Sequence, residues 1–159
     1  MSEENVLFAR ETETDAAAGD GTPEILTDKY LIFVSDGLFY GIDAEQVVEL
    51  ITNHNITRLP RVPHYVRGII NLRGQIIPII DIRLRLGKPP REDCCVVVTN
   101  VDNNLIGILV DGMEKMVDVS KEAILPMPTH SSQMLVSGMC SLPDSGTMLI
   151  LDCDQLIHG

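Results

Sequence analysis

Gly68-Ile69-Ile70-Asn71-Leu72-Arg73-Gly74-Gln75-Ile76-Ile77-Pro78-Ile79-Ile80-Asp81 is the stretch that decides the fold. Apolar and polar residues alternate up to Arg73, which predicts a strand that ends in a glycine turn. The four isoleucines between Gln75 and Asp81 predict a return strand that is buried on both faces. Pro78 has no N–H for a ladder, so we expect an edge, a bulge or a barrel seam at that point. Asp81 suits the N-cap of a short helix.

The polar side of this hairpin carries Asn71 and Arg73 beside many isoleucines. Such side chains are mostly exposed, so one interpretation is the solvent-facing side of an ordinary hairpin. The other interpretation is a recognition surface. Glu49, in a second strand-like segment, is a candidate ion-pair partner that would orient Arg73 or tie two strands together.

Composition favours a mainly β protein. The chain has 159 residues, 45% of them apolar, but only 4% aromatic and no Trp. Its core therefore consists of Ile, Leu, Val and Met, and the β-branched members of that set favour strands. The length suits one domain, or two small ones that share a core.

The chain carries no signal for membrane insertion or export. No apolar run approaches the roughly 20 residues that span a bilayer. The start, Met1-Ser2-Glu3-Glu4, is acidic where a signal peptide is basic. We therefore expect a cytoplasmic protein.

Charge is distributed unevenly along the chain. The net charge of −11 argues against nucleic acid and anionic membranes as partners. Residues 1–28 hold eight acids and one base, which predicts a flexible acidic tail, although the apolar stretch Val6-Leu7-Phe8-Ala9 within it could dock somewhere. Residues 58–91 hold eight bases and one acid. That basic segment is either a docking face for an acidic protein or a surface whose charges are balanced locally.

Catalytic and metal-binding motifs are missing from the sequence. The four cysteines, at 94, 95, 140 and 153, have no C-x-x-C spacing, and the four histidines are scattered. We expect buried thiols that act as small hydrophobes. There is no phosphate-binding glycine loop and no nucleophile elbow. The sequence therefore predicts a protein without cofactor, metal or enzymatic activity.

The chain also contains an approximate internal repeat. Tyr40-Gly41-Ile42 matches Ile106-Gly107-Ile108, and the segments that begin at Gly68 and Gly138 match each other. Each half would contain about five short strands, which close their edges best as a small barrel. We therefore predict a first barrel at about 29–87 and a second at about 94–157, although chance similarity between β sequences is the alternative.

Several blocks of this sequence resemble the CheW family of chemotaxis coupling proteins, over about residues 28–157. The blocks are Tyr40-Gly41-Ile42-Asp43, Arg67-Gly68-Ile69-Ile70-Asn71-Leu72-Arg73-Gly74, Pro78-Ile79-Ile80-Asp81-Ile82-Arg83 and Gly107-Ile108-Leu109-Val110-Asp111-Gly112. The resemblance implies a mainly β fold of two five-stranded SH3-like barrels and a scaffold without catalytic activity. Such proteins join the regulatory domain of the histidine kinase CheA to the cytoplasmic tips of methyl-accepting chemoreceptors.

Carried over by position, the resemblance assigns receptor binding to Val47, Glu49, Gly68, Asn71 and Arg73, and leaves the kinase-binding residues unassigned. Two alternatives stay open: a CheW-like adaptor of another array pathway such as pilus motility, and a double barrel that binds a small regulatory ligand.

Overall fold

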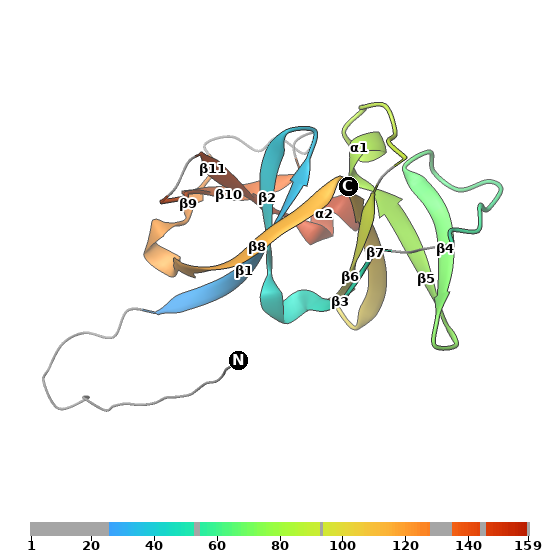
Figure 1. Cartoon of the computed structure of the whole chain (residues 1–159), viewed down its shortest axis with the longest axis horizontal. Coiled ribbons are helices and arrows are strands. Elements are labelled where there is room, and N and C mark those ends of the chain that lie inside the picture. Colours follow the sequence, from blue (N-terminus) through green and yellow to red (C-terminus); the bar gives the residue numbers. More distant parts are fainter. Residues whose placement is uncertain (1–25, 53–54, 93, 128–134, 144–145, 159) are drawn as a thin grey trace, which may run out of the picture.

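The computed structural model describes residues 26–52, 55–92, 94–127, 135–143 and 146–158. Two twisted sheets lie side by side in this structure (Figure 1). The six-stranded sheet has the order β8 (Gly112–Ser120), β1 (Thr27–Ser35), β2 (Leu38–Asp43), β11 (Thr147–Leu151), β10 (Val136–Ser141) and β9 (Leu125–Pro126). The five-stranded sheet has the order β3 (Val47–Ile51), β6 (Cys95–Val101), β7 (Asn104–Val110), β5 (Gln75–Asp81) and β4 (Val66–Leu72). The helical elements are η3 (Ala44–Gln46), α1 (Ile82–Arg85), η4 (Lys121–Ala123) and α2 (Cys153–His158).

The hairpin turns follow from the local sequence. Asp36 and Gly37 join β1 to β2 with φ of 53° and 78°, and Arg73 and Gly74 join β4 to β5 with φ of 51° and 86°. Two successive positive φ values define the tight turn whose twist matches that of paired strands. The expected N-cap is also present, because Asp81 accepts a hydrogen bond from the Arg83 amide at 2.9 Å.

The internal repeat is confirmed by strand register. In the five-stranded sheet Gly68 pairs with Ile79, and in the six-stranded sheet Gly138 pairs with Ile150. A bulge precedes the glycine in both hairpins. The parallel contacts correspond as well, since β5 pairs with β7 as β11 pairs with β2.

The strands of the two sheets are exchanged between the repeats. The β1–β2 hairpin pairs with β8 and β11, which come from the second half of the chain. The β6–β7 hairpin likewise pairs with β3 and β5 from the first half. This corrects the expected division into a barrel at 29–87 and a barrel at 94–157, because each sheet takes strands from both ranges. The mainly β architecture of two units is as expected.

Neither sheet closes into a complete ring of ladders among the described strands.

The prediction that β5 is buried on both faces along its whole length is wrong at one position. Ile76 is 62% exposed, whereas the other three isoleucines of the strand are buried. Ile76 lies next to the turn, beyond the part of β5 that packs under other strands. Pro78 directly precedes the residues that pair with β7, as expected for a residue without an N–H.

Three apolar clusters hold the molecule together. One lies within each sheet, and the largest lies between them and combines Phe33 and Ile42 of one sheet with Ile80 and Ile108 of the other. Helix α2 lies between the sheets (Figure 1) and adds the fully buried Leu156 to that shared core. The two sheets therefore share part of their stability.

The start of the ordered fold lies slightly earlier than predicted. Strand β1 begins at Thr27, which pairs with Ser120, within the range expected for the acidic tail. Residues 1–25 of that predicted tail lie outside the described residues. Within the described ranges, no helix is long and apolar enough to cross a bilayer.

Candidate protein-docking site

The residues that the sequence assigns to receptor binding lie on the two edge strands of the five-stranded sheet. Val47 and Glu49 belong to β3, and Gly68 and Asn71 belong to β4. Arg73 occupies the turn after β4. The structure brings the two strands together, because the Arg73 guanidinium donates a hydrogen bond to the Glu49 carboxylate at 2.7 Å.

This ion pair lies at the surface. The Arg73 side chain is 72% exposed and that of Glu49 is 29% exposed. The hydrogen bond that Arg73 donates to Glu49 raises the pKa of the Arg73 guanidinium above its ordinary value, so the cation persists at any physiological pH. The pair therefore presents an oriented cation with unused donors to a partner.

Asn71 acts on the turn that carries Arg73. Its side-chain oxygen accepts a hydrogen bond from the Gly74 amide at 3.0 Å. The bond satisfies a turn amide and holds Arg73 in the positive-φ conformation that directs it toward β3. We infer that Asn71 is a positioning residue for Arg73.

Gly68 is buried among residues of its own chain. Its φ is +146°, and an added Cβ would collide with the carbonyl oxygen of Thr57. Thr57 forms two backbone hydrogen bonds with Ile69, of 2.8 and 2.9 Å. The close approach at Gly68 is thus made by the chain itself.

Strand β3 exposes apolar residues that the sequence assignment missed. Val47 is half-buried against the shared core, whereas Val48 is 51% and Leu50 is 42% exposed. A bulge between Val47 and Glu49 in the pairing with β6 accompanies this pattern. The sequence Val47-Val48-Glu49-Leu50-Ile51 predicts a strand with two faces. It does not show which of the two faces the rest of the chain buries. The two exposed side chains precede and follow Glu49 in the sequence and give this edge strand an exposed apolar surface.

The basic segment 58–91 is largely balanced by local contacts. Its ion pairs are Arg67–Asp81, Arg73–Glu49, Arg83–Asp111, Lys88–Asp36 and Arg91–Asp111. Arg85 instead lies over the Tyr65 ring, 4.8 Å from its centroid, and donates to two carbonyls of α2. Arg58 and Arg61 are exposed, and no residue in the described part of the chain forms an ion pair with either. The local-balance interpretation therefore holds for most of the segment.

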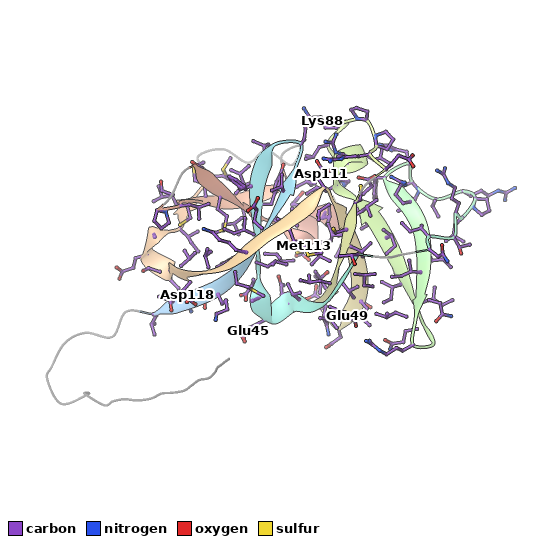
Figure 2. The ribbon with its side chains drawn as sticks, in the orientation of Figure 1. Glu45, Glu49, Lys88, Asp111, Met113 and Asp118 are labelled. Carbon is purple, nitrogen blue, oxygen red and sulfur yellow. The ribbon has the colours of Figure 1, made fainter. Side chains whose placement is uncertain are left out.

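Asp111 is the centre of a charged cluster where the sheets meet, and Figure 2 shows it close to that junction, below Lys88. Arg83 donates two hydrogen bonds of 2.8 Å to its carboxylate, and the Asp36 amide donates a third of 2.9 Å. The Asp111 side chain is only 5% exposed. These donors, Arg83 first, hold the pKa of Asp111 below its ordinary value. The cluster ties the β1–β2 turn, the end of β7 and α1 together, which is a structural role.

The described residues contain no group of three His, Cys, Asp or Glu side chains that could hold a metal ion. Among the described residues, none of the four cysteines forms a disulfide. Burial raises the pKa of the Cys153 thiol to about 12, and burial also raises that of Cys94. Neither thiol is a ready nucleophile, because the thiolate is the reactive form.

Comparison with known proteins gives the family. The family model described as the CheW-like domain matches residues 29–159. The chain belongs to this family.

Among the members of the family, the chemotaxis protein CheW of Klebsiella aerogenes is 30% identical over 141 residues, covering 86% of this chain and 85% of that protein. The chemotaxis protein CheW of Treponema pallidum is 34% identical over 129 residues, with 76% of each chain covered. Among solved structures, the scaffolding protein TtCheW from Thermoanaerobacter tengcongensis matches with a TM-score of 0.77 at 27% identity, covering 84% of this chain and 94% of that one. The CheW-like fold agrees with the two sheets of the structure.

Proposed function

We propose that this chain is a non-catalytic scaffold that couples the tips of methyl-accepting chemoreceptors to a CheA-like histidine kinase. The observation that carries the proposal is membership of the CheW-like family over residues 29–159, supported by the likeness to a solved scaffolding CheW. The proposed partners place the protein in the cytoplasm.

The proposed receptor contact centres on Arg73 and Glu49. A receptor tip is a helical hairpin, and a helix binds a surface that offers apolar contacts beside directed charges. Val48 and Leu50 supply exposed apolar area on the same edge strand as Glu49. Asn71 and Gly68 act indirectly, Asn71 by holding the turn and Gly68 by letting the Thr57 segment pack on β4.

The kinase contact is the second half of the proposal. The regulatory domain of such kinases resembles this fold, so we expect a contact between β units of similar shape. Holding kinase and receptor together shifts the kinase between its states only to the extent that the contacts differ between those states.

The test is the affinity of Arg73→Glu for a soluble receptor-tip fragment and for the kinase regulatory domain, both from the same genome. We expect receptor binding to weaken about tenfold or more, since a charge at the contact is reversed. Kinase binding and the melting temperature should change little, because an exposed ion pair contributes little to stability.

Two further variants sharpen this test. Lys29→Glu makes the same charge change on an exposed residue of the other sheet and should leave both affinities unchanged. Exchanging the charges, Glu49→Arg with Arg73→Glu, should keep the strands tied yet still impair receptor binding. Unchanged receptor affinity of Arg73→Glu would reject the site, and failure of the wild type to bind either partner would reject the function.

The first alternative function, a CheW-like adaptor of a pilus-motility pathway, differs from the proposed one in the receptors that the protein couples to the kinase. A pilus-motility adaptor would use the same contacts, so deletion of the gene should impair twitching instead of swimming.

The second alternative, a double barrel that binds a small ligand, has little support from the described residues. A hollow of about 580 Å³ between the start of β5 and the β6–β7 turn is lined largely by exposed residues, including Ile76, Asp102 and Asn103.

A further inference from the structure

The six-stranded sheet has an open seam between β8 and the end of β10. Strand β8 pairs with β1 on one side only among the described strands, and β9 pairs with β10 only at Gly138 and Met139. A hollow of about 480 Å³ occupies this seam. Its apolar lining consists of Val117, Val119, Ala123, Cys140, Leu142 and Pro143.

The hollow opens onto the apolar cluster of this sheet. Val119 and Cys140 are buried members of that cluster, and Val117 and Leu142 pack against it. Its charged lining is Lys115 and Asp118, whose formal charges cancel. The volume falls within the roughly 300–1,000 Å³ that is typical of binding sites. The site therefore favours an apolar occupant over a strongly charged one.

The internal repeat explains how this seam differs from the corresponding gap between β3 and β4 in the five-stranded sheet. In the five-stranded sheet the gap between β3 and β4 is crossed by the Glu49–Arg73 ion pair. The strand register places Lys115 at the position of Glu49, because Glu49 pairs with Val98 as Lys115 pairs with Ile32. Counted from the matched glycines, Pro143 takes the place of Arg73. Lysine and proline cannot form the corresponding pair.

The N-terminal segment leaves the fold at the rim of this hollow. The Leu26 carbonyl accepts a hydrogen bond of 3.2 Å from the Lys121 amide, and Thr27 pairs with Ser120. Ser120 and Ala123 both line the hollow. Residues 10–25 separate the apolar stretch Val6-Leu7-Phe8-Ala9 from this exit point, and a linker of that length reaches up to roughly 50 Å when extended. Covalent attachment keeps the effective concentration of the stretch at the hollow high.

We propose that Val6-Leu7-Phe8-Ala9 docks in this hollow as an added extended strand against the open edge of β8. Main-chain pairing with β8 supplies hydrogen bonds, and the side chains of Leu7 and Phe8 cover Val117 and Leu142. The docked segment protects an edge strand that would otherwise invite pairing with another chain. This proposal does not depend on the receptor or kinase contacts.

The test compares amide hydrogen exchange in the full-length wild type and in the double variant Leu7→Asp/Phe8→Asp. Aspartates cannot occupy the apolar hollow, so we expect exchange in 112–120 and 140–142 to become at least about tenfold faster. The matched control Thr12→Asp/Thr14→Asp adds the same charge to the same segment and should stay within about twofold of wild type. Exchange in 47–51 should be equal in all three proteins. Equal exchange of β8 in all three would overturn the proposal.

A second measurement identifies the occupant. In Phe8→Cys/Ser141→Cys a short bismaleimide should join the two introduced thiols within one chain, since Ser141 is exposed at the hollow, and peptide mapping together with the mass of one chain plus one linker would verify this. The control Ala16→Cys/Ser141→Cys should give much less of this product. A cross-link between two chains, or exchange protection that rises with protein concentration, would instead assign the hollow to a second copy and overturn the proposal.

Discussion

Exposure decides what each arginine of this chain does. The Arg83 side chain is 14% exposed and is held by Asp111 at the junction of the sheets, whereas the Arg73 side chain is 72% exposed and, among the described residues, forms an ion pair with Glu49 alone. A buried cation needs every donor satisfied, while an exposed one keeps donors available. The same residue type therefore stabilises the fold at one position and is suited to bind a partner at the other.

At this scale we expect Asp111→Asn to destabilise the protein by about 2 kcal/mol, because the amide cannot satisfy the charge of Arg83. Urea denaturation at pH 7 measures the change. Asp118→Asn, on the exposed outer part of β8 (Figure 2), is the control and should stay within about 0.5 kcal/mol of wild type. Equal stability of the two variants would contradict a structural role for Asp111.

The same carboxylate predicts a pH dependence. Its pKa in the folded chain lies below the ordinary 3.8, so the unfolded chain binds its proton first as the pH falls. The stabilisation by Asp111 is complete above about pH 4 and is lost as the pH falls through the folded-state pKa. The difference in unfolding free energy between wild type and Asp111→Asn should therefore shrink below about pH 4. A difference that stays constant down to about pH 2 would contradict the assignment.

At the scale of elements, strand β4 is shaped by a neighbouring backbone as much as by its ladder with β5. The Thr57 segment lies against β4 at Gly68, where a side chain would meet a carbonyl oxygen. The turn glycine that ends the strand, Gly74, has open space around it. Both glycines have positive φ, but only one of them is also required for packing.

We therefore expect Gly68→Ala to cost about 2–3 kcal/mol, combining backbone strain with a collision that backbone atoms cannot easily relieve. Gly74→Ala should cost about 1 kcal/mol, since only conformational strain is added. Chemical denaturation of both variants measures the two costs. If the two costs were equal, the close approach of Thr57 would not be the reason for glycine at position 68.

For the whole molecule, the exchange of strands couples the two sheets. Each half of the chain holds only part of each sheet, and the largest apolar cluster combines residues of both. A half-length fragment would leave the outer strands without partners and the shared core open. We infer that the molecule unfolds as one cooperative unit.

This predicts that fragments 26–92 and 94–158 are each unfolded alone by circular dichroism but form a folded complex when mixed. Unfolding of the intact chain should show a single transition by fluorescence and by hydrogen exchange in both sheets. A fragment that folds cooperatively by itself, or two separate transitions in the intact chain, would contradict the coupling.

Local chemistry determined much of this protein from the sequence alone. The turn at Arg73-Gly74, the N-cap Asp81 and the internal repeat all follow from residues whose geometry depends on near neighbours or on simple periodicity, whereas the Glu49–Arg73 pair could be named only as a candidate. The family could also be inferred, because the most specific of its sequence blocks lies in one continuous hairpin.

Only the tertiary structure decided which strands pair across the repeats and which basic side chains form ion pairs with acidic ones. It also decided that Ile76 is exposed and that Gly68 faces the chain's own Thr57. The physical reason is that alternation defines two faces of a strand but not what covers them. In two similar repeats each hairpin has two nearly equivalent partners, and the choice between them is made by the core that forms when both sheets pack together.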